Sequence, residues 1–255
     1  MPAATEHPAE LHRALRYAVF SGGKRLRPTL AFGAAVAGGA DPERAIPVAI
    51  AAELVHTCSL VLDDLPAQDD NTMRRGRPAA HVAFGSATAI LAGSALLTEA
   101  FAQCIRLPDP SACVEAGTGL TDTIGYRGLI GVQIDDLAFN PSGTNLKDVS
   151  RIHLRKTASL FRFSAWGGGL AAGLSGEHLD SLAAFGSAYG LAFQVVDDLL
   201  DEDPGQCSIL HVLSRREARG HIRGLLDQAA RETEVFGPDG WVLAGLARRV
   251  EGLIP

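Results

Sequence analysis

The sequence has few cysteines, and none of them lies in a pattern that suggests a covalent or metal-bound framework. The four cysteines, Cys58, Cys104, Cys113 and Cys207, form no CxxC pair and show no zinc-ligand spacing. They therefore indicate neither a disulfide framework nor a zinc site. Free thiols are typical of a reducing compartment, so we expect a cytoplasmic protein.

An excess of basic residues is also lacking, and so are targeting and membrane-spanning patterns. The chain has 23 Lys and Arg against 29 Asp and Glu, a formal net charge of −6. This balance argues against a nucleic-acid partner. The N-terminal residues lack the basic-then-apolar order of a signal peptide. No run of about 18 consecutive apolar residues occurs, so we expect no membrane span.

Alternating β-branched runs with hairpin turns are likewise absent, and the apolar residues recur instead with helical spacing. This spacing predicts helices over 8–20, 43–64, 79–104, 147–165, 178–202 and 212–234. We therefore predict an all-α fold in which residues 1–255 form a single-domain helical bundle, with room for a site between facing helices. The glycine-rich stretch "WGGGLAAGLSG" (166–176) indicates either close helix packing or short breaks.

Two aspartate clusters each follow an apolar helical segment: "LVLDDLPAQDD" (60–70) and "AFQVVDDLLDED" (192–203). Neighbouring carboxylates on a helix face repel one another. A solvated helix end would explain one such cluster, but two clusters after apolar segments favour bound cations. Mg²⁺ prefers carboxylate oxygens and commonly links them to substrate phosphates. Two clusters facing each other across a bundle therefore predict Mg²⁺ ions and a diphosphate.

The helix spacing differs between the two clusters. In the second, Asp197 and Asp198 share a helix face with Asp201. In the first, Pro66 disturbs the helix, so the spacing leaves open which aspartate beside Asp63 turns inward.

Basic residues gather in "SGGKRLRP" (21–28), "MRRGRP" (73–78) and "HLRKTASLF" (153–161). Each alone could be a solvated turn, but arginine and lysine also bind phosphates. Beside two acidic clusters they indicate a divided site, in which acidic groups hold Mg²⁺ with one diphosphate and basic groups hold a second anion. His56 precedes Asp63 by seven residues and lies on nearly the same helix face.

These segments, read with "ELVHTCSLVLDDLPAQDDNTMRRGRPAAH" and "GLAFQVVDDLLD", resemble the motif series of the trans-isoprenyl diphosphate synthases, or polyprenyl synthetases. The motifs occur in the family's order and cover most of residues 10–235. The resemblance implies a homodimeric helical bundle around a deep apolar cavity. It also implies a Mg²⁺-dependent enzyme that joins an allylic diphosphate to isopentenyl diphosphate, head to tail.

The resemblance further implies a role for each motif residue. The predicted Mg²⁺ ligands are Asp63, Asp64, Asp69, Asp197, Asp198 and Asp201. The groups predicted beside the allylic diphosphate or the nascent cation are Arg74, Lys156, Thr157 and Gln194; with Asp63, Asp64, Asp69 and Asp197 they form the predicted catalytic set. The predicted isopentenyl diphosphate pocket consists of Lys24, Arg27, His56 and Arg75.

Product length is predicted from two features of the first aspartate motif. Four residues separate Asp64 from Asp69, a spacing that resembles short-chain synthases of farnesyl and geranylgeranyl type. Five residues before Asp63 stands Cys58, where farnesyl-type relatives carry a bulky aromatic side chain. A small side chain leaves the cavity deeper, so the motif most resembles geranylgeranyl diphosphate synthases.

The match is incomplete after the second aspartate motif. The family usually carries a lysine-bearing loop there, but this chain has no lysine after Lys156, and Gln206 stands where the last loop lysine is expected. Either the loop is absent or the sequence omits a segment. Two alternatives to an active short-chain synthase therefore stay open: a non-catalytic or impaired family member, and a diphosphate-ionising terpene synthase on the same fold.

Overall fold

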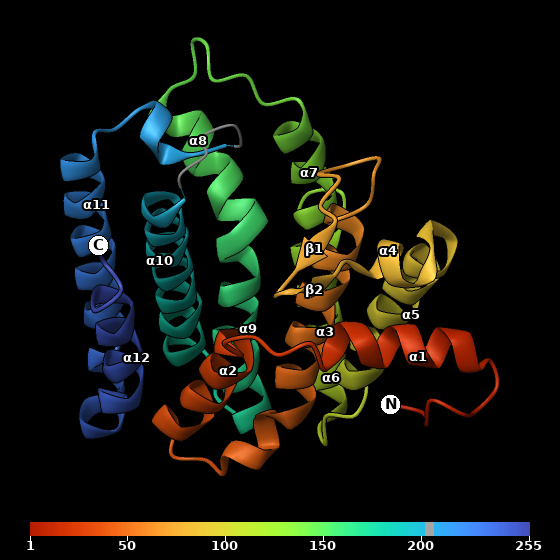
Figure 1. Cartoon of the computed structure of the whole chain (residues 1–255). Coiled ribbons are helices and arrows are strands. Elements are labelled where there is room, and N and C mark those ends of the chain that lie inside the picture. The colour runs from red at the N-terminus through yellow and green to blue at the C-terminus, as the bar shows by residue number, and fades with distance from the viewer. Residues whose placement is uncertain (202–206) are drawn as a thin grey trace.

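The computed structural model describes residues 1–201 and 207–255, and it shows a bundle built from helices (Figure 1). The helices are α1 (Ala9–Val19), α2 (Leu26–Ala37), α3 (Ile46–Asp63), α4 (Ala80–Phe84), α5 (Ser86–Cys104), α6 (Pro110–Ile124), α7 (Leu129–Leu137), α8 (Leu146–His153), α9 (Ser159–Ala172), α10 (Glu177–Leu200), α11 (Arg215–Glu232) and α12 (Trp241–Glu251). Short helical turns are η1 (Pro42–Ala45), η2 (Leu154–Ala158), η3 (Ile209–His211) and η4 (Glu234–Gly240), and a small hairpin pairs β1 (Met73–Arg74) with β2 (Arg77–Pro78). The predicted all-α, single-domain bundle is confirmed.

Each predicted helix is present, although two are divided. The segment over 79–104 is split at Gly85, whose φ of 83° interrupts the helix between α4 and α5. The segment over 147–165 contains the π-helical turn η2 and continues to Ala172. Sequence patterning missed α2, α6, α7 and α12, which are short or interrupted by glycine and proline.

Helix α9 occupies the centre of the bundle, where it packs against α2, α3 and α10 (Figure 1). Its glycines permit this close approach: a Cβ atom on Gly168 would lie 2.3 Å from the carbonyl oxygen of Ala31 in α2. Close packing is therefore the reason for the glycine-rich stretch. A break also occurs there, because Gly173 ends α9 with a φ of 89°.

Helices α3 and α10 end on the same side of the bundle, with α9 between them (Figure 1). Asp63 is the last residue of α3, and the second aspartate motif covers the last turn of α10. The fold thus brings two motifs that are more than 130 residues apart in the sequence to one end of the molecule.

Three helical segments of the described chain have the length and composition of a membrane span. They are Pro42–Asp63, with a mean hydropathy of 1.8, and Ser86–Cys104 and Glu177–Leu200, each with 1.2. In that order, 61%, 39% and 61% of the most apolar stretch is buried inside the bundle. The hydropathy of these segments does not support our expectation that the chain has no membrane span, which was based on the lack of a long apolar run. That expectation stays a prediction.

Candidate active site

Two adjoining cavities open at this end of the bundle. An apolar cavity of about 480 Å³ extends between α3, α5, α6 and α7 and is lined by Cys58, Leu62, Leu97, Ile124, Leu129 and Ile134, among others. A basic pocket of about 590 Å³ is lined by Lys24, Arg25, Arg27, Glu53, His56, Arg74, Arg75, Gln194 and Asp197, among others. Arg27, His56, Leu60 and Thr157 line both spaces. The polar pocket and the apolar cavity therefore meet at these shared residues.

The first aspartate motif folds back on the end of α3. The helix ends before Pro66, and the backbone N–H of Asp69 donates to the carbonyl oxygen of Asp63 at 2.9 Å. Burial raises the pKa of Asp63 to about 6, with a further contribution from the nearby charge of Asp69, while Lys156 opposes the shift. Asp69 is thus the aspartate that the turn brings beside Asp63.

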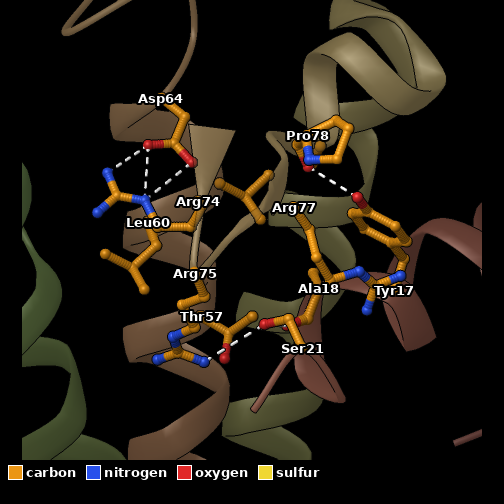
Figure 2. Close-up of a pocket in the computed structure, with 12 residues that line it drawn as sticks. Tyr17, Ala18, Ser21, Thr57, Leu60, Asp64, Arg74, Arg75, Arg77 and Pro78 are labelled. Atoms are coloured by element: carbon orange, nitrogen blue, oxygen red, sulfur yellow. Dashed lines mark hydrogen bonds and ion pairs between the residues drawn. The ribbon is translucent and has the colours of Figure 1, made fainter. Parts of the chain in front are cut away.

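Asp64 faces a different partner. Its carboxylate is 2% exposed and accepts hydrogen bonds from Nε and Nη2 of Arg74, with an Nε–Oδ1 distance of 3.0 Å (Figure 2). These contacts raise the pKa of Arg74. An ion pair with protein therefore engages Asp64, and its predicted role as a metal ligand stays a prediction.

The hairpin β1–β2 directs Arg74 and Arg75, the first two arginines of "MRRGRP", to different partners. Arg75 and Gly76 form its two-residue turn with φ values of 51° and 74°, as a type I′ turn requires. Arg74 consequently turns toward Asp64, while Nη1 of Arg75 points toward Ser21 (Figure 2). The same nitrogen donates to the carbonyl oxygen of Gly22. The sequence analysis missed this hairpin, although a glycine after a polar residue between two short segments is a turn signal.

Lys156 and Thr157 lie on the π-helical turn η2, between the two aspartate motifs. Lys156 Nζ is 2.5 Å from Asp136 Oδ2 on α7, and it also acts electrostatically on Asp63 and Asp69. On the other side, Thr157 Oγ1 donates to Gln194 Oε1 at 2.5 Å. Asp136 was missed by the sequence analysis; the signal was "VQIDDL", a third apolar segment that ends in aspartates.

In the second aspartate motif, as in the first, neighbouring aspartates have different surroundings. Burial raises the pKa of Asp197 to about 6, with Asp198 and Asp201 adding to the shift and Lys24 and Arg27 opposing it. Asp197 lines the basic pocket. Asp198 is 6% exposed and accepts hydrogen bonds from the backbone N–H of Ile209 at 2.7 Å and from Gln194 Nε2 at 2.8 Å. Asp201 is exposed at the C-cap of α10.

The residues predicted for isopentenyl diphosphate all lie around the basic pocket. Arg27 is held over the ring of Phe161 at 4.4 Å, and burial lowers its pKa to about 10. Burial, reinforced by Arg27 and Arg75, holds the pKa of His56 well below its usual value, so this imidazole is neutral at pH 7. The pocket therefore combines fixed positive charges with one neutral ring.

Beside the β1–β2 hairpin lies a small cavity of about 30 Å³, drawn in Figure 2. Thr57 lines it and is 3% exposed, and its Oγ1 makes no hydrogen bond. A cavity of this size is large enough for a water molecule.

The acidic residues suit Mg²⁺ by their chemistry. No three His, Cys, Asp or Glu side chains within 1–201 and 207–255 are grouped as a metal site. Mg²⁺, however, is usually held by one or two carboxylates together with waters and substrate phosphates. Asp63, Asp69 and Asp197 provide hard oxygen ligands, and the raised pKa values of Asp63 and Asp69 include repulsion from neighbouring carboxylates that a cation would relieve. The donor set fits Mg²⁺.

Two further predicted positions complete the comparison with the sequence. Cys58 is 5% exposed and lines the apolar cavity, where the chain-length prediction requires it. Gln206, at the place expected for the loop lysine, lies outside the described residues.

A helical bundle that joins an arginine-rich pocket to an apolar cavity beside two aspartate motifs has the architecture of the isoprenoid synthase fold. The model of the polyprenyl synthetase family matches residues 8–204, and the chain belongs to that family.

Relatives and solved structures agree with this membership. The chain is 37% identical over 232 residues to geranylgeranyl pyrophosphate synthase 12 of Arabidopsis thaliana, an alignment that covers 86% of this chain and 64% of that protein. It spans less than two thirds of the length of the first curated relatives. An FPP/GFPP synthase from Zymomonas mobilis superposes with a TM-score of 0.90 at 34% identity, covering 98% of this chain and 91% of that one. A geranyltransferase of Helicobacter pylori, solved with magnesium and isoprenyl diphosphate, has a TM-score of 0.84 at 28% identity and covers 99% of this chain and 90% of that one.

Proposed function

We propose that this protein is a Mg²⁺-dependent short-chain prenyltransferase, which condenses an allylic diphosphate with isopentenyl diphosphate to farnesyl or geranylgeranyl diphosphate. The observation that carries the proposal is that a basic pocket and an apolar cavity adjoin at Arg27, His56 and Thr157, which line both. A molecule with an anionic head and an apolar tail matches this junction. Magnesium and isoprenyl diphosphate bound to the Helicobacter pylori relative support the same ligand classes.

The residues around Lys156 are arranged to ionise the allylic diphosphate. Mg²⁺ held through Asp63, Asp69 and Asp197 would neutralise the departing diphosphate. Lys156 and Arg74 add fixed positive charge beside it. The carbon–oxygen bond breaks with its electron pair leaving on diphosphate, and the apolar cavity excludes water from the allylic cation.

The basic pocket would hold the diphosphate of the second substrate. Lys24, Arg27 and Arg75 supply cationic donors, and neutral His56 supplies an uncharged one. The double bond of isopentenyl diphosphate attacks the allylic cation, and the released diphosphate accepts the proton that is then lost. Thr157 lines both cavities, and the hydrogen bond from its Oγ1 to Gln194 orients both side chains.

The proposal includes a homodimer and a cytoplasmic location, without a nucleic-acid partner or a membrane span. The homodimer rests on family membership. Four free cysteines support the cytoplasmic location.

A second candidate is a non-catalytic or impaired family member. The absence of lysine after Lys156 in the sequence favours it, since a loop lysine would assist ionisation. The terpene synthase alternative has less support, because it does not need Lys24, Arg27, His56 and Arg75 together in one pocket.

A turnover assay separates these candidates. Purified protein is incubated with Mg²⁺, radiolabelled isopentenyl diphosphate and, in turn, dimethylallyl, geranyl or farnesyl diphosphate, and the products are separated by chain length. We expect Mg²⁺-dependent chain growth. Hydrocarbon release without use of isopentenyl diphosphate would identify a terpene synthase. Folded protein that turns over no allylic substrate would identify the non-catalytic member.

A further inference from the structure

Two carboxylates, Glu53 and Asp197, lie among the cationic side chains of the basic pocket, and only Asp197 belongs to an aspartate motif. Glu53 on α3 is 8% exposed and lines the basic pocket with Lys24, Arg25, Arg27 and Arg75. A buried negative charge repels a diphosphate at short range. If Glu53 contributes to anion binding, another effect of this side chain must outweigh the repulsion.

The direct partner of Glu53 is Arg25. Arg25 Nη1 donates to Glu53 Oε1, and Arg25 Nη2 donates to the carbonyl oxygen of Val19 at 2.5 Å. The guanidinium therefore connects the end of α1 to the middle of α3. The Glu53 side chain is 10% exposed and that of Arg25 is 34% exposed, so solvent screens this pair only in part.

Arg25 also has an unusual backbone conformation. It is the N-cap residue of α2, with a left-handed φ of 50° and ψ of 35°. Residues other than glycine, asparagine and aspartate rarely adopt this region, so other contacts must hold it. Lys24 precedes this residue, and Arg27 follows two positions later. The backbone conformation at Arg25 therefore determines the directions in which the side chains of Lys24 and Arg27 point.

Glu53 acts on the other arginines through its charge. It raises the pKa of Arg27 and of Arg75, each of which burial lowers. Arg25 and Arg75 repel one another across the pocket. In the absence of a bound anion, Glu53 is the carboxylate that offsets this repulsion at the α3 side of the pocket, while Asp197 acts from α10.

We propose that Glu53 is a positioning residue, which fixes Arg25 and thereby aims Lys24 and Arg27 at a diphosphate that Glu53 itself does not bind. The substrate assignment rests on the proposed function. Glu53 lies one turn before His56 on α3, so a rigid helix carries both the anchor and one wall of the pocket.

The direction in which Glu53→Gln changes anion binding shows whether Glu53 acts as a positioning residue or only as a negative charge. If Glu53 were only a negative charge in the pocket, Glu53→Gln would tighten the binding of anions. If it positions the cationic residues, Glu53→Gln weakens binding. We expect the dissociation constant of inorganic diphosphate, measured by calorimetry in EDTA, to rise about tenfold. Because this measurement needs no turnover, it stands if the proposed reaction fails.

The kinetic counterpart applies if the protein is active. Glu53→Gln should raise KM for isopentenyl diphosphate about tenfold and change kcat and the KM of the allylic substrate by less than about twofold. Arg25→Gln should have the same effect, and the double variant should be no worse than the worse single one. Glu10→Gln, which breaks the exposed Glu10–Arg13 pair, is the matched control and should change nothing.

Three results would overturn the proposal. They are unchanged or tighter diphosphate binding in Glu53→Gln, additive losses in the double variant, and wild-type protein that binds no diphosphate in EDTA. A loss of folding is read separately from the melting temperature. Glu53→Asp then gives a further comparison, because it keeps the charge but shortens the side chain: simple charge predicts unchanged diphosphate binding, whereas positioning predicts weaker binding.

Discussion

Asp64 accepts hydrogen bonds from both Nε and Nη2 of Arg74, whereas the adjacent Asp63 lies beside Asp69 and Lys156. The α3 helix ends between these neighbouring aspartates, so their carboxylates serve different partners. Asp64 fixes the hairpin that carries Arg74 and Arg75 to the site, and Asp63 is left facing the cavity that it lines. Of these two consecutive aspartates, Asp64 thus makes a structural contact and Asp63 is a candidate metal ligand.

The first prediction tests the Asp64–Arg74 contact. In Arg74→Lys, a point charge replaces the fork that reaches Asp64 with both Nε and Nη2. The free energy of unfolding should fall by about 1–3 kcal/mol in urea titrations, because a buried carboxylate loses donors. kcat should fall about 10²-fold if Arg74 also stabilises the leaving diphosphate. Arg106→Lys, at a surface pair with Glu99, is the control. Wild-type values for both quantities would contradict the assignment.

The second prediction concerns pH. Burial raises the pKa of Asp63 and of Asp197 from 3.8 to about 6. Between these values the native state binds more protons than the unfolded state, so the stability of the metal-free protein falls as pH rises from about 4 to 6. Asp63→Asn and Asp197→Asn remove this loss. In EDTA at pH 7, each variant should be about 1–2 kcal/mol more stable than the parent after allowance for screening, and the gain should disappear near pH 4. Guanidinium unfolding from pH 4 to 8 measures the difference, and variants less stable than the parent at pH 7 would refute it.

The third prediction concerns metal and diphosphate together. Mg²⁺ with inorganic diphosphate at about 100 times the dissociation constant should stabilise the protein by about 2.7 kcal/mol. For a chain of this size the melting temperature should rise by about 5–10 °C. Asp69→Asn should lose most of the stabilisation that depends on Mg²⁺. It should keep the stabilisation that diphosphate alone gives in EDTA. An unchanged response in Asp69→Asn would remove this residue from the proposed metal set.

The sequence indicated which residues gather around the two cavities more completely than it indicated their contacts. Motif residues such as Lys156 and Gln194 could be named because the motifs that contain them resemble those of a known family. Their hydrogen-bond partners could not, because Asp136, Glu53 and the β1–β2 hairpin reach the site only through tertiary packing. The long apolar helices were predicted from periodicity. α7 was missed because a nine-residue helix that lines a cavity carries apolar residues where solvent-facing polar ones would be expected.

The last prediction concerns product length, which the depth of the apolar cavity should set. Cys58 lines this cavity from α3. Gly93 of α5 packs directly against this part of α3, since a Cβ atom placed on it would lie 3.1 Å from Leu62 Cδ2 and 3.7 Å from Cys58 Sγ. Little spare room therefore exists behind Cys58, and a larger side chain there must extend into the cavity.

Cys58→Phe should shorten the longest product, from geranylgeranyl toward farnesyl or geranyl diphosphate, because the prenyl chain meets the ring before it is fully grown. Gly93→Ala should shift the product distribution in the same direction but less, since it displaces Leu62 by only a few tenths of an ångström. Cys58→Ser, of nearly equal size, is the control and should keep the parent's product. Radiolabelled products separated by chain length provide the readout, together with the rate of the first condensation, which should change little because the diphosphate sites are not altered. A Cys58→Phe variant that is folded and active but makes the parent's product would place the limit of chain growth elsewhere in the cavity, toward Leu97 and Ile124.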